Sequence, residues 1–274
     1  MKKLSLIFLF LTAFTYNTMW AQITIAPTMV FIDQQNRFGS FLVLNGSEEA
    51  QEVSIEFPFG YPVTSQDGNI DMVYDDSAAA DRYGISDVVR GFPQNFVLQP
   101  GERQTVRLTI RPKDFTDGTY WTRIKTTSNA QEPPVGAASE DEITAQITYE
   151  FEQVTTLFYK HGDTNTGIDI NEFVAQDTGE NIEFVVDVSR TGNSPFLGSI
   201  ILELTDTEGN LSAEKLASTS IYYDYRQIFV IPKSDLKDGT YNASVTFETR
   251  RPDVAREDIV QMEPVSRSIS YTKE

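Results

Sequence analysis

The tetrapeptide Asp-Gly-Thr-Tyr occurs twice in this chain, at residues 117–120 and 238–241, and each copy follows a Pro-Lys pair. Apolar segments typical of strands precede and follow both copies. An Asp-Gly pair between such segments is a strong hairpin signal, because these residues tolerate the backbone angles of a tight turn. The distance between the copies suits two tandem domains of ordinary size. We interpret the pattern as an internal duplication; the alternative is that the tetrapeptide is merely a common hairpin sequence.

Strand patterns dominate the rest of the chain. Between Phe92 and Ser128, a Pro100-Gly101 turn separates an apolar run from an alternating one that places Val106 and Leu108 on one face. The tyrosines that end the two repeats, Tyr120 and Tyr241, fit tyrosine corners, in which the hydroxyl bonds to the backbone a few residues upstream. Further strands are expected at 23–32, 40–44, 51–57, 143–151, 182–188, 199–204, 222–231, 241–247 and 265–271.

Two segments depart from the strand pattern. Residues 61–91 have few alternating positions and predict an insertion or long loop with one helical turn near 77–82. Residues 213–217 look briefly helical. Turn signals otherwise recur at the spacing of β-sandwiches. The predicted fold class is all-β, with two tandem immunoglobulin-like β-sandwich domains, residues 22–160 and 161–274, after a signal peptide.

The signal peptide is predicted for residues 1–21. Lys2 and Lys3 precede an apolar run, Leu4–Phe14, that is too short to span a bilayer, and small Ala21 suits the cleaved side. We therefore expect an exported protein, periplasmic or extracellular. The chain has no cysteine, so the fold must do without disulfides, which domains of more than about a hundred residues can manage.

The charge balance narrows the class of partner. With 40 acidic and 22 basic residues, the formal net charge is −18, which disfavours nucleic acid and anionic membrane surfaces. No apolar run after the signal peptide is long enough to insert into a membrane. We expect a protein partner, no nucleic acid and no membrane insertion.

Few residues in the sequence are candidates for catalysis or metal binding. His161 is the only histidine and stands beside Gly162 between the predicted domains, so an exposed linker residue is the better interpretation. The acidic stretch 67–76 resembles a calcium loop, but Met72 stands where such a loop needs glycine and no glutamate closes it. We expect no metal, no cofactor and no enzymatic activity.

The cleanest alternation in the sequence lies at residues 143–151. Its odd-numbered positions are apolar and its even-numbered positions are polar, and a slip of phase at Gln153 predicts a β-bulge. On composition alone the apolar face belongs to the core of the domain. A role in binding requires the strand at a sheet edge with part of this face exposed. The apolar residues are Ile143, Ala145, Ile147, Tyr149 and Phe151.

Several segments together resemble the PapD-like family of periplasmic pilus-assembly chaperones, which have two immunoglobulin-like domains. The resemblance covers most of the first predicted domain, and the second only in size and strand rhythm. A weaker resemblance links residues 67–71, 86–89 and 98–101 to exported proteins that bind WxL-type surface proteins. The segments similar to PapD-like chaperones are Pro27–Phe31, Leu42–Asn45, Phe96–Gly101, Val106–Leu108, Tyr120–Ser128 and Leu157–Lys160.

The resemblance implies that residues 143–151 form the family's subunit-binding strand, which completes a partner's incomplete sandwich by strand addition. In that family an arginine and a lysine hold the C-terminal carboxylate of the subunit. The matching positions here are Thr28 and Thr156, so both charges are missing. Lys160 stands at the position of an interdomain arginine and keeps the charge without the bidentate fork. Binding should then rely on backbone pairing and apolar contacts, and should tolerate salt.

We therefore expect a non-enzymatic, chaperone-like exported protein that binds fimbrial or other exported subunits through Thr28, Thr156 and the apolar face of residues 143–151. One alternative is a structural or adhesive surface module that binds a cell-wall or protein partner through the loop at 61–91. Another is a glycan-binding sandwich that uses acidic loops and aromatic residues such as Trp121 and Tyr83.

Overall fold

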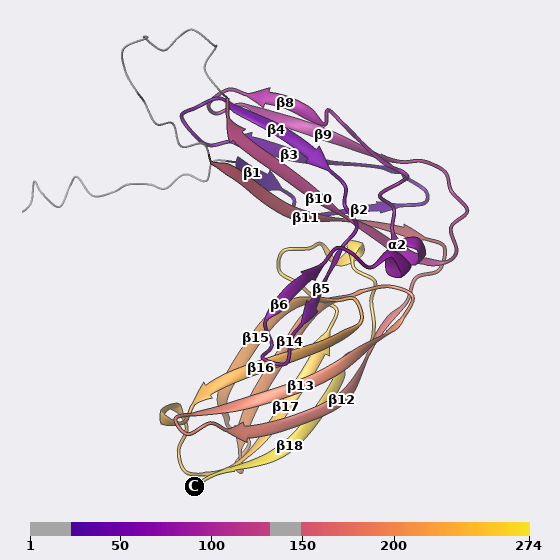
Figure 1. Cartoon of the computed structure of the whole chain (residues 1–274). Helices are drawn as coiled ribbons and strands as arrows, with labels where there is room; N and C mark the ends of the chain where they lie inside the picture. Colours follow the sequence, from indigo (N-terminus) through magenta and orange to yellow (C-terminus); the bar gives the residue numbers. More distant parts are fainter. Residues whose placement is uncertain (1–22, 132–148) are drawn as a thin grey trace, which may run out of the picture.

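The computed structural model describes residues 23–131 and 149–274, and in these ranges the chain forms two β-sandwiches in succession (Figure 1). The predicted signal peptide lies outside the described residues. The first sandwich contains β1 (Ile23–Ala26), β2 (Met29–Asp33), β3 (Phe38–Asn45), β4 (Gln51–Glu56), β7 (Val89–Phe92), β8 (Asn95–Leu98), β9 (Arg103–Ile110), β10 (Gly118–Ala130) and β11 (Glu150–His161). Its sheets have the orders β1-β3-β9-β7 and β2-β11-β10-β4-β8.

The second sandwich contains β12 (Thr166–Asp177), β13 (Asn181–Gly192), β14 (Phe196–Asp206), β15 (Leu211–Ile221), β16 (Asp224–Pro232), β17 (Gly239–Glu248) and β18 (Val265–Lys273). Its sheets have the orders β12-β13-β16 and β15-β14-β17-β18. Two short 3-10 turns, η1 (Lys233–Asp235) and η2 (Arg256–Asp258), lie in its loops. The prediction of an all-β chain with two tandem immunoglobulin-like sandwiches is confirmed.

Each sandwich buries its own core through strand alternation. In β9, Val106, Leu108 and Ile110 are at most 4% exposed, whereas Arg103 and Arg107 on the opposite face are exposed. Strands β14 and β17 supply the same alternation to the second core. Full burial of one such aliphatic side chain contributes about 1.5–3 kcal/mol, so the alternation read from the sequence fixes which face of each strand points inward.

Both copies of Asp-Gly-Thr-Tyr build the same corner. Gly118 and Gly239 have φ angles of 147° and 148°, which favour glycine because a Cβ atom would be strained there. The hydroxyls of Tyr120 and Tyr241 donate to the carbonyl four residues upstream, at 3.1 and 2.8 Å. Strands β10 and β17 begin at these turns, and each lies inside its sheet beside the strand that follows it. The predicted tyrosine corners are therefore present in both sandwiches.

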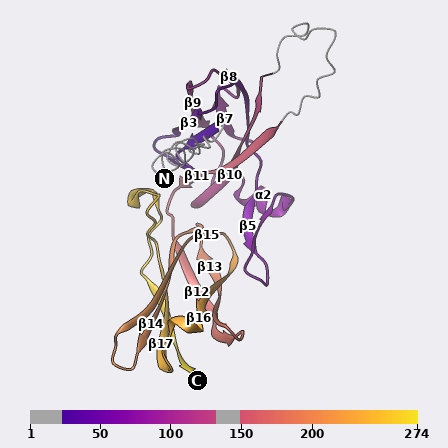
Figure 2. The same ribbon diagram turned by 90° about the vertical axis from the view of Figure 1, so that its left-hand side faces the viewer.

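Residues 61–91 are more ordered than the predicted loop. Strands β5 (Tyr61–Thr64) and β6 (Ile70–Val73) form an antiparallel hairpin, and helix α2 (Ser77–Tyr83) follows where one helical turn is predicted. The carboxylate of Asp76 caps this helix by accepting the Ala79 N–H at 2.9 Å. The hairpin leaves the first sandwich and runs alongside the second, next to β16 (Figures 1 and 2). This segment therefore bridges the two sandwiches.

Three local features differ from the sequence predictions. Residues 213–217, expected to be helical, belong to the edge strand β15, because pairing with β14 outweighs the helix preference of so short a stretch. The predicted bulge at Gln153 is wrong, since the register between β10 and β11 continues without a shift. Strand β12 was not predicted, and its alternation is broken by a bulge between Ile170 and Glu172.

Candidate partner-binding site

Strand β11 has one neighbour along its first half and two along its second half. Strand β10 pairs with all of it, whereas β2 pairs only with Thr156–Lys160. The chain before β2 belongs to the other sheet, since β1 pairs with β3 and Pro27 lies at the crossover, as the sequence predicts. Within the described ranges, Glu150–Thr155 is therefore an open sheet edge.

One hydrogen bond fixes the direction of the backbone groups along this edge. The Thr156 N–H donates to the Thr28 carbonyl at 3.2 Å, so the backbone groups of Thr156 point away from β10. Because these groups alternate sides along a strand and the register has no shift, Glu150, Glu152 and Val154 present theirs to the open edge. The edge accommodates a partner strand of about six residues, or roughly 20 Å.

Two apolar side chains beside this edge are exposed. Tyr149 is 63% and Phe151 is 43% exposed, and their ring centroids are 6.4 Å apart. Phe151 projects to the same side of β11 as Leu157 and Tyr159, which are fully buried. The facing sheet covers these two residues but not Phe151. Tyr149 and Phe151 therefore extend the core face of β11 beyond the part that the sandwich itself covers.

The other residues predicted to bind a partner are placed as follows. Ile143, Ala145 and Ile147 lie outside the described residues. Thr28 and Thr156 are adjacent through their backbone hydrogen bond, but Thr28 is exposed and Thr156 is buried. The structure thus brings the two threonines together, and the surroundings of Thr156 explain its burial.

Arg123 places a positive charge beside Thr156 that the sequence analysis overlooked. The two residues are cross-strand partners in β10 and β11, and Arg123 Nη1 donates to the Thr156 hydroxyl. Arg123 Nε donates to the Gly60 carbonyl at 2.8 Å. Arg123 is only 7% exposed, and among the described residues it forms no ion pair and its Nη2 has no hydrogen-bond partner. An unpaired buried guanidinium is costly and favours binding of an anion.

Aromatic side chains enclose Arg123 where the two sandwiches meet. The Arg123 guanidinium lies 5.2 Å from the Tyr222 ring centroid, and this ring packs edge-on against Trp121 with centroids 4.8 Å apart. The Tyr222 hydroxyl faces Arg123 and Thr156 without reaching hydrogen-bond geometry. Burial raises the pKa of this hydroxyl, so it remains a neutral donor at physiological pH. Donor groups therefore converge here.

Lys160 connects the two sandwiches. Its Nζ donates to the backbone carbonyls of Glu257 and Asp258, at 3.3 and 3.1 Å, in the η2 turn of the second sandwich. The same ammonium group lies 6.0 Å from the centroid of the Phe31 ring. Two separate carbonyl acceptors suit the point charge of lysine, because neither requires the planar fork of arginine.

The other candidate residues, the acidic side chains and His161, are not gathered into a metal site in the described part of the chain. The described part of the chain holds no group of three or more histidine, aspartate or glutamate side chains arranged to bind a metal ion. His161 is not the exposed linker residue predicted from the sequence: it is the last residue of β11 and is half-buried, with Nδ1 3.4 Å from the Tyr159 hydroxyl. In residues 23–131 and 149–274, no helix is long and apolar enough to cross a membrane.

Comparison with known proteins gives matches among solved structures alone. No protein-family model and no curated protein matches the chain. The chaperone YadV is 10% identical, with 91% of this chain and all of that chain covered and a TM-score of 0.45. The SafB chaperone of Salmonella enterica, solved with the SafA pilin, is 12% identical over 90% and 96% of the two chains, with a TM-score of 0.44. A chaperone–tip adhesin complex of CFA/I fimbriae gives 13% identity over 90% and 98%, with a TM-score of 0.45.

Proposed function

We propose that this protein is a non-enzymatic, chaperone-like protein of the bacterial envelope that captures an exported protein subunit by strand addition to β11. The observation that carries the proposal is the open edge at Glu150–Thr155, with Tyr149 and Phe151 exposed beside it. A partner strand along this edge gains main-chain hydrogen bonds, and apolar side chains of β11 enter the partner's groove. The signal peptide predicted at residues 1–21 supports export to the periplasm or the cell exterior.

The chemistry at the end of this edge indicates how the partner strand terminates. Thr156 directly follows the open stretch, and Arg123 and Tyr222 lie beside it. A partner strand that ends here brings its C-terminal carboxylate to the free Nη2 of Arg123. A charge-assisted hydrogen bond in a buried site is stronger than a neutral one and less screened by salt than a surface ion pair. We assign to Arg123 the positive charge that Thr28 and Thr156 lack.

A proline substitution tests the edge without altering the core. Val154 presents its N–H to the open edge, and its side chain is 44% exposed. Val154→Pro removes this N–H and no bond to β10, and proline is tolerated at such edge positions. Val154→Ala is the matched control because it retains the N–H.

Tagged mature protein carrying either substitution is incubated with periplasmic extract, and bound proteins are quantified by mass spectrometry. We expect Val154→Pro to retain the β-type circular dichroism spectrum and to capture about tenfold less of each specific partner than Val154→Ala, because both an edge hydrogen bond and strand fit are lost. Equal capture by the two folded variants would refute strand addition at this edge.

The two alternative functions have less support from the contacts. An adhesive module would use residues 61–91 as a free loop, but the β5–β6 hairpin packs against β16. A glycan site would need exposed aromatic faces, but Trp121 is 1% exposed and stacks on Tyr83 with centroids 4.9 Å apart. The open edge of β11 remains the surface best suited to a partner.

A further inference from the structure

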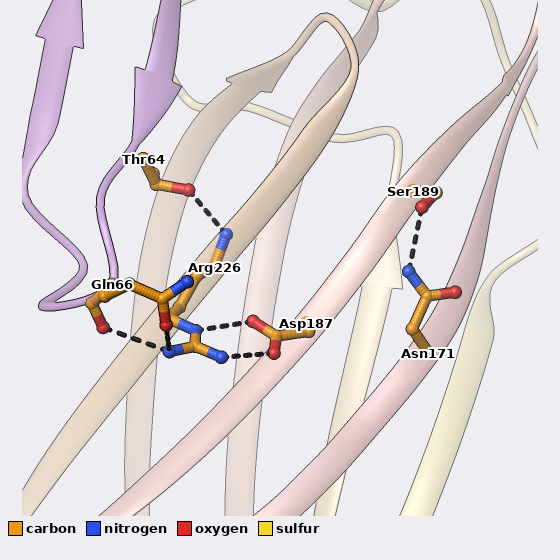
Figure 3. A network of polar contacts seen from close by, with 6 residues as sticks. All are labelled: Thr64, Gln66, Asn171, Asp187, Ser189 and Arg226. Atoms are coloured by element: carbon orange, nitrogen blue, oxygen red, sulfur yellow. Dashed lines mark hydrogen bonds and ion pairs between the residues drawn. The ribbon is translucent and has the colours of Figure 1, made fainter.

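A single arginine fastens the tip of the β5–β6 hairpin to the second sandwich (Figure 3). The Arg226 backbone N–H donates to the Thr64 hydroxyl at 2.7 Å. Its Nη1 donates to the side-chain and backbone oxygens of Gln66, at 2.7 and 3.1 Å. Its Nε and Nη2 form a bidentate pair with Asp187, at 2.7 and 2.5 Å. The guanidinium of Arg226 therefore links the hairpin to both β16 and β13.

The turn of the hairpin adds an apolar contact to this fastening. Gly68 has a φ of 74°, and a Cβ atom there would lie 3.2 Å from Cγ1 and 3.7 Å from Cβ of Ile228 in β16. Glycine is needed at this point both for the turn angle and for the close approach. The tip of the hairpin is thus held by three hydrogen bonds from Arg226 and by an apolar contact with Ile228.

The base of the same hairpin covers Arg123. The Gly60 carbonyl accepts from Arg123 Nε at 2.8 Å, and Phe59 stacks on Trp121 with ring centroids 5.6 Å apart. Tyr61, the first residue of β5, packs edge-on against Tyr223 of the second sandwich at 4.8 Å. The base is held to β10, since the Arg123 N–H donates to the Pro58 carbonyl at 2.8 Å. Release of the tip from β16 therefore frees the second sandwich, whose Tyr222 ring covers Arg123.

We propose that the β5–β6 hairpin is a strap that holds the two sandwiches closed over Arg123, and that its release admits a partner's carboxylate to Nη2. The importance of this release rests on the function proposed above, because the strap controls access to the same site. In the closed form, Arg123 is 7% exposed and enclosed by aromatic rings. A carboxylate reaches Nη2 only after the strap and the rings move apart.

The contacts at the tip of the hairpin are polar and exposed, whereas those at its base are aromatic and buried. The tip is therefore the point of release. The hydrogen bonds that join Arg226 Nη1 to Gln66 of the hairpin are exposed, so water competes for them. The base of the hairpin is packed among buried aromatic residues. Local opening begins where contacts are polar and solvent-accessible, so loss of the Arg226 contacts favours the open form.

Arginine modification measures this opening without any partner. Phenylglyoxal modifies exposed guanidinium groups, and the rate at a buried arginine follows the population of the open form when reclosing is fast. Modification of Arg123 is followed by peptide mass spectrometry, with the exposed Arg250 as internal reference. We expect Arg226→Ala to raise the rate at Arg123 about tenfold relative to Arg250, because the two charge-assisted hydrogen bonds from Nη1 to Gln66 are lost.

A matched control and a second hairpin variant complete the design. Lys233→Ala removes an ion pair with Asp177 that does not touch the hairpin, and it should leave the Arg123 rate unchanged. Gln66→Ala removes the side-chain acceptor of Arg226 Nη1 and leaves the Arg226–Asp187 pair in place. It should raise the Arg123 rate by less than Arg226→Ala does, because the Gln66 backbone carbonyl still accepts from Nη1.

The readout separates failure of the strap from failure of the proposed function. If Arg123 is modified at the wild-type rate in both Arg226→Ala and Gln66→Ala, with circular dichroism showing that both are folded, the strap is refuted whatever the protein binds. If the rates change as expected while Val154→Pro captures partners as well as Val154→Ala does, the strap stands and strand addition at β11 fails.

Discussion

Replacement of Arg123 by methionine should separate stability from partner binding. The change removes two hydrogen bonds from a charged donor, to Gly60 and Thr156, each with a net contribution of about 1.5–3 kcal/mol. It also removes a buried cation without a counter-charge, whose desolvation costs several kcal/mol. Methionine is unbranched and flexible, so it fills much of the same space. These opposing effects leave the free energy of unfolding within about 1 kcal/mol of the wild-type value.

Urea unfolding followed by fluorescence measures this difference directly. Trp121 is the only tryptophan outside the predicted signal peptide, and it packs against Tyr222, whose ring also contacts the altered residue. With a slope of about 2 kcal/mol/M, a change of 1 kcal/mol shifts the midpoint by about 0.5 M. Partner capture should fall by about tenfold or more, since a charge-assisted hydrogen bond is lost. A destabilisation of about 3–5 kcal/mol, typical of a broken buried ion pair, would show that Arg123 is satisfied within the fold and would refute the carboxylate assignment.

Two further predictions concern the corners and the helix cap. Tyr241→Phe should lower the unfolding free energy by about 1 kcal/mol. Tyr120→Phe should lower it by less, because the Tyr120 hydroxyl is nearer to solvent. Thermal unfolding of the two variants checks this order, and the reverse order would contradict it. Hydrogen bonds from the Tyr61 hydroxyl and the Ala79 N–H lower the pKa of Asp76, so its contribution is present above pH ~4 and is lost as pH falls through the folded pKa. Asp76→Asn retains a cap but should flatten the pH dependence of the urea midpoint below pH ~5; an unchanged dependence would argue against this role.

The sequence predicts elements that depend on local signals. The Asp-Gly turns, the alternation in β9 and the tyrosine corners all follow from residues close together in the chain, and the structure contains them. The open edge at Glu150–Thr155 exists because the chain changes sheets between β1 and β2, and no local sequence pattern shows which part of β11 this leaves unpaired. Local sequence signals also failed to predict the strap. Residues 61–91 show no strong alternation, and the contacts of the hairpin tip lie in the other sandwich.

The candidate site shows why matching positions along a sequence is not sufficient to locate the charged residue of a binding site. Thr28 and Thr156 suggested that no cation remained near the end of the edge, because each position was considered along its own strand. Arg123 lies in the neighbouring strand and reaches Thr156 across the β10–β11 ladder. Within the strand pattern of β10, an arginine between Trp121 and Lys125 is typical of an outer, solvated face. Its burial results from the second sandwich and the hairpin base, which are distant in sequence.

The open edge of β11 also bears on self-association. An unpaired strand edge on a free protein invites a second copy to pair with it. Here Glu150 and Glu152 lie on that edge, in a chain with a net charge of −18. Two copies laid edge to edge would bring like charges into cross-strand positions, which is destabilising. These like charges thus disfavour pairing between identical chains while leaving the main-chain groups available to a strand of different charge.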